Sequence, residues 1–307
     1  MFQIQKAKRE KLKASIVCEG LQGSGKSVAA LMLGYALAES EATEGQSVDD
    51  LLGAIDTENR SLNLLVGRTF DGYKIGEFMK IDFNDNFSPQ NFKLAQEALI
   101  NAGAKAIIID SYTHMWAREG GVLDKVSEVQ ANSKNQYTAW GQDEVREGKE
   151  LIFKLIRNPQ AHIVGTVRLK EKHQVAEGKV IGLGEQQVMQ DGFKYEPDLV
   201  LRFTGNGNYE VMKSRYELLP VGATGVLTME LCRDIAAYLQ EGIDPTELFE
   251  KQRTDLLNSL KEVISTNATA KMLFDTVMSS EYSGQKVSEL PLETVKAVYY
   301  KIMNAIR

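Results

Sequence analysis

The chain has 307 residues, of which 43% are hydrophobic and 25% are charged, so it is neither a disordered tail nor a fibrous rod. It contains no run of about 18 apolar residues that could span a membrane, and we expect no membrane partner. The net charge of −6 argues against nucleic acid wrapping around the whole surface but is compatible with a local basic site.

Cysteine usage and the first residues both favour a cytoplasmic protein. The two cysteines, Cys18 and Cys232, form no CxxC pair, which excludes a zinc knuckle and a disulfide framework. Such sparse cysteine usage is typical of a reduced compartment. The basic residues near the N-terminus precede no apolar stretch, so we expect no secretory signal.

Short apolar runs alternate with helix-favouring segments over the first two thirds of the chain, which predicts an α/β fold with a mostly parallel sheet. Strands are expected at 14–18, 53–56, within 73–83, at 106–110 and at 161–166. Helices are expected at 26–39, 89–103 and 137–157. Two later strands, 198–204 and 209–213, flank Gly-Asn-Gly-Asn, which predicts a hairpin.

The pattern changes past about residue 225, where only helical periods follow. These periods cover 227–240, 245–265, 268–279 and 292–306. We therefore expect residues 1–240 to form an α/β core and residues 241–307 to form a small C-terminal helical region.

Residues 20–27, Gly-Leu-Gln-Gly-Ser-Gly-Lys-Ser, match the G-x-x-x-x-G-K-[ST] pattern of a phosphate-binding loop. Glycines let backbone N–H groups turn toward a phosphate, and the dipole of the following helix favours negative charge. Lys26 would neutralise β- and γ-phosphate oxygens, and the Ser27 hydroxyl would ligate Mg²⁺. The pattern thus predicts ATP and Mg²⁺ as ligands, bound by Gly20, Gly23, Ser24, Gly25, Lys26 and Ser27.

Two carboxylates follow predicted strands and are candidates for metal binding and catalysis. Asp110 closes the apolar strand at 106–110, where it would hold Mg²⁺ directly or through water or, alternatively, cap the strand end. Glu58 follows the strand at 53–56 and could orient or deprotonate the attacking water. Asp56 and Glu58 could equally be a helix cap and a first-turn acid.

These three segments, in this order, resemble RecA-type recombinases: a phosphate loop, a strand ending Ile-Asp-x-Glu and a strand ending Ile-Asp-Ser. The resemblance covers roughly residues 12–220. It implies an ATPase in which Glu58 is the catalytic base, Lys26 and Asp110 assist it, and Ser27 and Asp110 hold the metal. It also implies a homo-oligomer, a ring or a filament, in which Lys213 and Arg215 reach the nucleotide of a neighbouring protomer, although both could be exposed strand charges.

Three further details, Trp116, Gly120-Gly121 and the segment 190–196, look more like the small RecA-like ATPases of phages, including the Sak-type single-strand-annealing group. This likeness implies action on single-stranded DNA in phage recombination, annealing or replication, in the host cytoplasm and beside phage or host recombination proteins. The DNA-binding candidates are Trp116, Arg118, Arg168, Lys170 and Lys172. Trp116 could instead belong to the core, and the basic segment could be an ordinary solvated hairpin.

One position departs from the resemblance and leaves other functions open. Thr166 stands near the place where RecA has a glutamine that senses the γ-phosphate, and Arg168 is an alternative for that role. The acidic charge balance favours a second function, a regulatory or assembly ATPase that switches a protein partner without DNA. A nucleotide or small-molecule kinase is a third function, for which the sequence lacks an arginine-rich lid.

Overall fold

The structure is a computed structural model and describes residues 6–131, 136–176 and 179–306. It divides into two compact units. Residues 12–240 form the larger one, and the residues up to Lys11 together with those from Glu241 onward form the smaller one.

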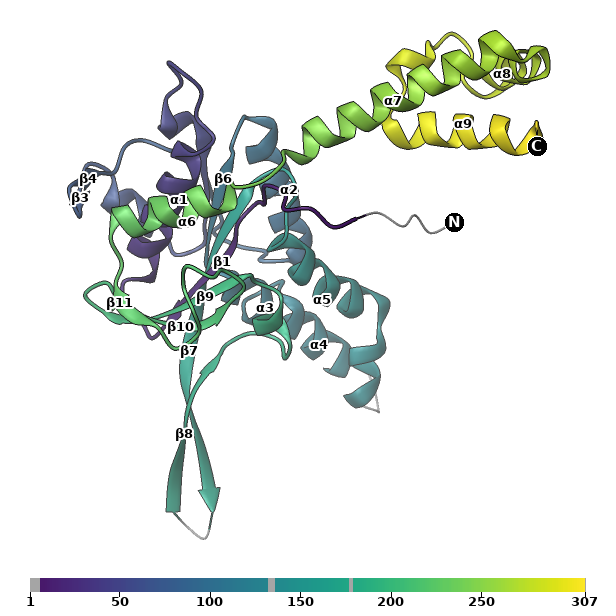
Figure 1. The fold of residues 1–307 in the computed structure, drawn as a ribbon. Helices are drawn as coiled ribbons and strands as arrows, with labels where there is room; N and C mark the ends of the chain where they lie inside the picture. The colour runs from purple at the N-terminus through teal and green to yellow at the C-terminus, as the bar shows by residue number, and fades with distance from the viewer. Residues whose placement is uncertain (1–5, 132–135, 177–178, 307) are drawn as a thin grey trace. The chain divides into compact units, whose positions relative to one another are not determined.

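The larger unit is built on a sheet of nine strands among the described residues, in the order β11-β10-β9-β1-β7-β6-β2-β5, with β8 paired to β7 (Figure 1). The six strands from β9 to β5 are parallel, and β8, β10 and β11 pair antiparallel. This confirms the predicted α/β fold class with a mostly parallel sheet. The bounds are β1 Ser15–Gly20, β2 Leu52–Asp56, β5 Met79–Asp82, β6 Ala106–Asp110, β7 His162–Ala176, β8 Lys179–Gln187, β9 Leu199–Gly205, β10 Asn208–Ser214 and β11 Thr224–Val226. A separate hairpin pairs β3 Thr69–Phe70 with β4 Tyr73–Lys74.

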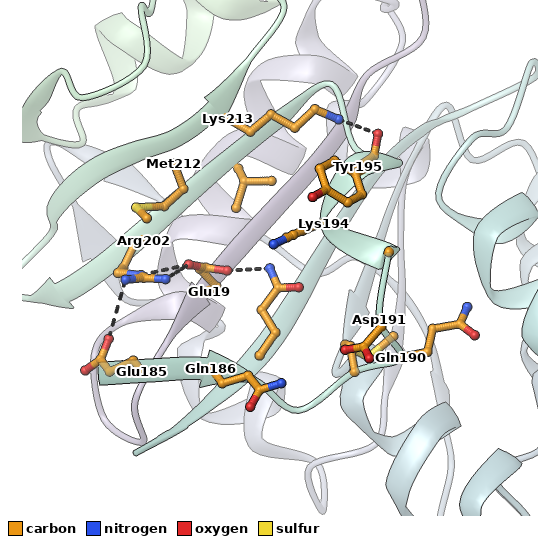
Figure 2. A pocket seen from close by; sticks show the side chains of 14 residues that line it. Glu19, Glu185, Gln186, Gln190, Asp191, Lys194, Tyr195, Arg202, Met212 and Lys213 are labelled. Carbon is orange, nitrogen blue, oxygen red and sulfur yellow. Dashed lines mark hydrogen bonds and ion pairs between the residues drawn. The ribbon is translucent and has the colours of Figure 1, made fainter. Parts of the chain in front are cut away.

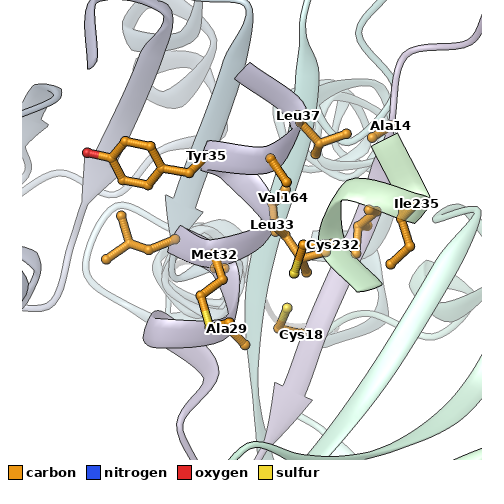
Figure 3. Packing of buried hydrophobic residues seen from close by; sticks show 14 of the residues in the cluster. Ala14, Cys18, Ala29, Met32, Leu33, Tyr35, Leu37, Val164, Cys232 and Ile235 are labelled. Atoms are coloured by element: carbon orange, nitrogen blue, oxygen red, sulfur yellow. The ribbon is translucent and has the colours of Figure 1, made fainter. Parts of the chain in front are cut away.

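Helices cover both faces of this sheet and create two apolar cores. The helices are α1 Lys26–Glu39, α2 Pro89–Asn101, α3 Tyr112–Ala117, α4 Val122–Ala131, α5 Asp143–Leu155 and α6 Met229–Leu239. Figure 3 shows Leu33 of α1, Cys232 of α6 and Val164 of β7 packed in the first core. The second core includes Val17 of β1 and residues of α2 to α5. Adjacent residues of one strand thus point into opposite cores, which is why the central strands are continuously apolar.

Parallel pairing brings the carboxyl ends of β1, β6 and β2 to one edge of the sheet, level with Arg168 in the middle of β7. Gly20 of β1 pairs with Arg168 of β7, and Asp110 of β6 pairs with Asp56 of β2. Because β7 lies between β1 and β6, the edge runs from the glycine-rich loop through Arg168 and Asp110 to Asp56. Such an edge is where open parallel sheets bind ligands.

Two predictions of element bounds were wrong. The helix expected at 137–157 begins at Asp143, after a 3₁₀ helix at Gln136–Gly141. Extended backbone at Gln142 separates them, and the acids at Asp143 and Glu144 stabilise the new helix start. The strand expected at 161–166 runs to Ala176, because β8 returns beside it and supplies hydrogen-bond partners. The predicted hairpin of β9 and β10 is confirmed.

The smaller unit contains three helices among its described residues, α7 Pro245–Thr266, α8 Ala268–Glu281 and α9 Leu292–Ala305. Asn267 begins α8 by accepting hydrogen bonds from Thr269 and Ala270, both at 3.0 Å. The helices bury a small apolar core that includes Leu260, Val277 and Ile302. The predicted C-terminal helical region is therefore present. Within the part of the chain described, no helix is both long and apolar enough to cross a membrane.

Candidate functional site

The glycine-rich loop joins β1 to α1 in the strand–loop–helix order that the sequence predicts. Gly23 and Gly25 have positive φ angles of 78° and 93°, which favour glycine. At Gly20 a Cβ atom would lie 2.5 Å from the carbonyl oxygen of Phe203. The loop is therefore formed by backbone with no room for a side chain at its first position.

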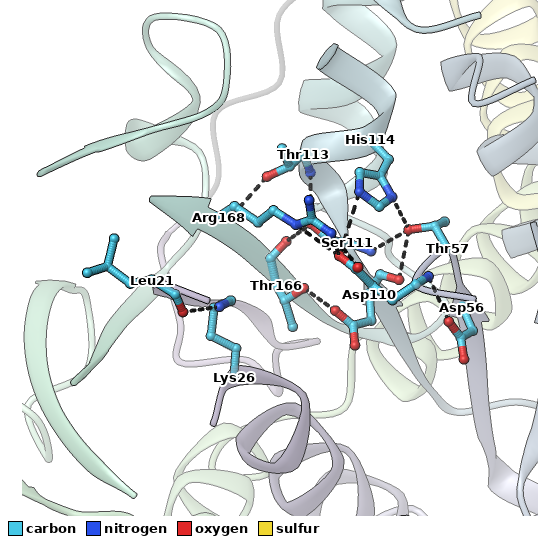
Figure 4. A network of polar contacts seen from close by, with 11 residues as sticks. Leu21, Lys26, Asp56, Thr57, Asp110, Ser111, Thr113, His114, Thr166 and Arg168 are labelled. Carbon is cyan, nitrogen blue, oxygen red and sulfur yellow. Dashed lines mark hydrogen bonds and ion pairs between the residues drawn. The ribbon is translucent and has the colours of Figure 1, made fainter. Parts of the chain in front are cut away.

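Two polar side chains of this loop fit a ligand rich in oxygen atoms. Lys26 donates a hydrogen bond from Nζ to the Leu21 carbonyl at 2.7 Å (Figure 4). Burial lowers the pKa of Lys26, while the negative charges of Asp110 and Glu58 raise it. The buried Ser24 hydroxyl has no hydrogen-bond partner among the described residues. A bound phosphate would supply an acceptor for both groups.

Asp110, at the end of β6, is buried with one carboxylate oxygen satisfied and the other not. The Thr166 hydroxyl donates to its Oδ1 at 2.5 Å, and its Oδ2 has no hydrogen-bond partner among the described residues. Burial raises the pKa of Asp110, and hydrogen bonding by Thr166 and Ser27 lowers it. An unsatisfied carboxylate oxygen beside the Ser27 hydroxyl fits a magnesium ion.

No group of three or more His, Cys, Asp or Glu side chains that could hold a metal lies among the residues described.

Two carboxylates at the end of β2, Asp56 and Glu58, make different contacts. Asp56 accepts hydrogen bonds from the backbone N–H groups of Glu58 and Leu62 at 2.9 and 3.1 Å, so it caps the turn. Glu58 instead pairs with Arg168, whose Nε lies 3.0 Å from its Oε1 and whose terminal nitrogen contacts both carboxylate oxygens. The capping alternative from the sequence therefore holds for Asp56, and a catalytic role for Glu58 stays a prediction.

His114 of α3 is a buried residue behind Glu58 that sequence reasoning did not place in the site. Its Nδ1 lies 2.6 Å from the Thr57 hydroxyl, and its Nε2 lies 3.6 Å from Oε1 of Glu58. Thr57 also accepts a hydrogen bond from the Ser111 N–H at 2.7 Å. Burial lowers the pKa of His114 to about 4, so the imidazole is neutral at pH 7. Its position four residues after Asp110, in the first helix beyond the strand, is the sequence signal that could have indicated it.

Comparison with known proteins finds likenesses among solved structures. No protein-family model matches this chain, and no curated protein matches it. Among solved structures, the crystal structure of the RadB recombinase matches with a TM-score of 0.38 and 11% sequence identity, over 76% of this chain and 92% of that one. Both values are low, so a functional assignment has to come from this chain's own residues.

Lys213 and Arg215 of the β10 end contact their own chain. Arg215 pairs with Asp198 at 2.8 Å, and its side chain is 54% exposed. Lys213 donates to the carbonyls of Tyr195 and Pro197, and burial lowers its pKa. A role for either in a neighbouring protomer stays a prediction that would require these contacts to exchange.

The five DNA-binding candidates lie in three different settings. Trp116 is half-buried against the second core, and Arg118 lies over the ring of Phe87 at 5.9 Å. Arg168 pairs with Glu58, whereas Lys170 is exposed on the same strand. The Lys172 side chain lies outside the described part of the structure.

A pocket of about 510 Å³ is lined by residues of β1 and β9 (Figure 2). Its buried Glu19 accepts a hydrogen bond from Arg202 at 2.7 Å and another from Gln187 of β8. Both oxygens of Glu19 are thus satisfied, and the contacts hold the end of β8 against β1 and β9. This polar group stabilises the base of the hairpin.

Proposed function

We propose that this chain is a RecA-like ATPase that binds ATP with Mg²⁺, hydrolyses it to ADP and phosphate, and acts on single-stranded DNA. One observation supports this most: Arg168 of β7 pairs with Glu58 at 3.0 Å and, through its backbone, with Gly20 of the glycine-rich loop. Thr166 of the same strand donates to Asp110 at 2.5 Å. These contacts bring together the glycine-rich loop, β7 and the ends of β6 and β2.

Each residue then has a distinct role in hydrolysis. Lys26 and the backbone of the glycine-rich loop bind and orient the β- and γ-phosphates, and Ser27 and Asp110 hold the metal. Bound Mg²⁺ supplies charge neutralisation at the phosphate oxygens. Glu58 orients the attacking water and accepts its proton. Thr166 fixes the carboxylate of Asp110 through its hydrogen bond to Oδ1.

Hydrolysis would be completed in a homo-oligomer by Lys213 and Arg215 of a neighbouring protomer. The half-exposed Arg215 side chain supports this role, because a guanidinium can exchange a surface carboxylate for a phosphate. The ion pair with Asp198 is solvent-exposed on the Arg215 side and costs little to break.

The β7–β8 hairpin is the proposed surface for single-stranded DNA. It continues the strand that carries Thr166 and Arg168, so a DNA contact at Lys170 lies four residues from a group that touches Asp110. The chain would serve phage recombination, annealing or replication, in the cytoplasm of a bacterial host and beside phage or host recombination proteins.

Phosphate release measured with and without single-stranded DNA tests this function, with Lys26→Ala as the inactive control and electron microscopy of the same mixture. We expect release that needs Mg²⁺ and rises with DNA, together with rings or filaments. Absence of release from the unmodified chain would refute the ATPase. Release indifferent to DNA, with a protein partner recovered, would favour the regulatory ATPase that the net charge of −6 also suits. A phosphorylated acceptor would indicate a kinase.

A further inference from the structure

Glu58 lies between two side chains that differ in how firmly they are held. On one side is Arg168, with a 40% exposed side chain and contacts to both carboxylate oxygens. On the other is His114, which is 1% exposed. A carboxylate in such a position can change partners if one of them is drawn away.

The polar groups around His114 determine which of its two ring nitrogens carries the hydrogen. The Thr57 hydroxyl accepts from the Ser111 N–H, and its own hydrogen can go to His114 Nδ1 at 2.6 Å. The same hydroxyl also lies 2.9 Å from the Asp110 carbonyl, but that oxygen already accepts the Thr57 N–H at 2.7 Å, so the nearer His114 Nδ1 is the acceptor that still lacks a hydrogen. Nε2 then carries the hydrogen and faces the carboxylate of Glu58, whereas the other tautomer would turn a lone pair toward a negative charge.

The separation of 3.6 Å between His114 Nε2 and Glu58 Oε1 is longer than a hydrogen bond. His114 is therefore a donor aimed at Glu58 but not yet engaged. Glu58 is held instead by Arg168, and a carboxylate whose oxygens both accept from a guanidinium is a poor proton acceptor.

Arg168 is also positioned so that its guanidinium can exchange the carboxylate of Glu58 for a phosphate group. Its backbone pairs with Gly20, the first residue of the glycine-rich loop, and its charge lowers the pKa of Lys26. A guanidinium binds phosphate in the same forked geometry as a carboxylate, and a triphosphate carries more negative charge than one carboxylate.

We propose that Glu58 exchanges partners when the terminal phosphate arrives: the phosphate takes the guanidinium of Arg168, and Glu58 then accepts the hydrogen bond of His114. Arg168 is thus a restraint on the catalytic carboxylate, and His114 is a positioning residue for it. This exchange rests on the proposed function, since it assigns the terminal phosphate to the glycine-rich loop.

The test compares the affinities for Mg²⁺-ADP and for a β,γ-imido analogue of ATP by calorimetry. Glu58→Gln weakens the competitor for Arg168, so the analogue should bind about tenfold tighter while ADP affinity stays unchanged. Arg168→Ala should weaken analogue binding by about tenfold, and adding Glu58→Gln to it should then have no effect. Arg168→Lys, which keeps the charge but not the fork, should be intermediate and serves if Arg168→Ala does not fold.

A matched control comes from a second forked pair, Arg233 with Glu39, whose bonds are 2.8 and 3.2 Å. Glu39→Gln should leave the ratio of the two affinities unchanged. Nitrogen-15 spectra of histidine-labelled protein, which has three histidines, add a direct readout. The His114 Nε2 signal should shift with the analogue and not with ADP.

The outcomes distinguish a failure of ATP binding from a failure of the partner exchange at Glu58. If the unmodified chain binds neither nucleotide, the proposed function fails and the exchange fails with it. If it binds both, but Glu58→Gln leaves the ratio of affinities unchanged or the His114 signal responds equally to both nucleotides, the exchange is wrong while the ATP site stands.

Discussion

Thr166 donates to one carboxylate oxygen of Asp110 at 2.5 Å, and the other oxygen is buried with no hydrogen-bond partner among the described residues. The side chain is therefore fixed in place while half of its acceptor capacity is unused. Burial, together with the negative charges of Glu58 and Asp56, raises the pKa of Asp110. An ionised carboxylate in this setting destabilises the protein when no cation is bound, and its unpaired oxygen is able to bind one.

Asp110→Asn should stabilise the protein without nucleotide and abolish its turnover. A carboxyl whose folded pKa lies above its unfolded value of 3.8 destabilises the ionised folded state at pH 7. Asparagine keeps the acceptor for Thr166 and removes the charge. We therefore expect the free energy of unfolding, measured in urea, to rise by about 1 kcal/mol. Loss of the metal ligand should lower turnover by about a hundredfold or more.

Tryptophan fluorescence reports the unfolding of the larger compact unit, which contains Asp110, because both tryptophans, Trp116 and Trp140, belong to residues 12–240. Asp85→Asn is the control, since that residue is exposed in the loop between β5 and α2. Its removal should change neither quantity. A less stable Asp110→Asn protein would mean that the carboxylate is compensated in a way that the structure does not show.

Gly20→Ala should damage the phosphate-binding loop, whereas Gly141→Ala should not. A Cβ at Gly20 would meet the Phe203 carbonyl at 2.5 Å and the Ser24 hydroxyl at 2.4 Å, and backbone cannot give way as a flexible side chain can. Such overpacking costs about 1–3 kcal/mol of stability. We expect this loss in urea unfolding, with weaker nucleotide binding in calorimetry. Nothing lies within 4 Å of a Cβ at Gly141, so that variant is the matched control. Equal behaviour of the two would contradict the tight approach at Gly20.

The strand, glycine-rich loop and helix at residues 15–39 could be predicted from the sequence because their signals are local. Strand, glycines and helix follow one another in the chain, and the apolar run before Asp110 indicates a buried strand end without knowledge of neighbours. The two parallel strand ends that carry Asp56 and Asp110 meet because every strand of a parallel sheet ends at the same edge.

The partners of these residues could not be predicted, because they depend on strand order. Arg168 reaches Glu58 across 110 positions of sequence, and this requires β6 to lie between β7 and β2. Whether Asp56 caps the turn, as the alternative for this segment has it, likewise depends on where its side chain points after folding. The strand β8 agrees with the hairpin alternative for the basic segment, although glycines such as Gly182 and Gly184 weaken a strand pattern.

Lys170→Glu should weaken single-stranded DNA binding in proportion to a lost phosphate contact. Each phosphate neutralised adds about −0.7 to the slope of log affinity against log salt for single strands, so the slope should flatten by about that amount. Fluorescence anisotropy of a labelled oligonucleotide at several salt concentrations measures it. Lys74→Glu, an exposed lysine of β4, is the control with the same charge change. Parallel losses in both variants would indicate a general charge effect and refute a hairpin contact.

A buried acid–imidazole pair should make the larger unit lose stability in acid. His162 accepts the Ala14 N–H at Nδ1 and donates from Nε2 to Glu41 at 3.0 Å, and Lys13 lies 2.7 Å from the same carboxylate. Burial lowers the pKa of His162, and the bond to His162 lowers that of Glu41. Both folded values lie below the unfolded ones, so stability is complete above pH 6.5 and is lost on acidification.

The loss should come in two stages, first as the unfolded histidine becomes protonated below about pH 6.5 and then as glutamate is protonated below about pH 4.5. Urea unfolding followed by tryptophan fluorescence from pH 8 to pH 4 should show a fall of more than about 1 kcal/mol. The His162→Gln variant should be less stable at pH 7, and its free energy of unfolding should change less between pH 7 and pH 5. The free energy of unfolding of Glu41→Gln should change less below pH 5. A His162→Gln profile as steep as that of the unmodified chain would show that other groups, not this pair, control its acid sensitivity.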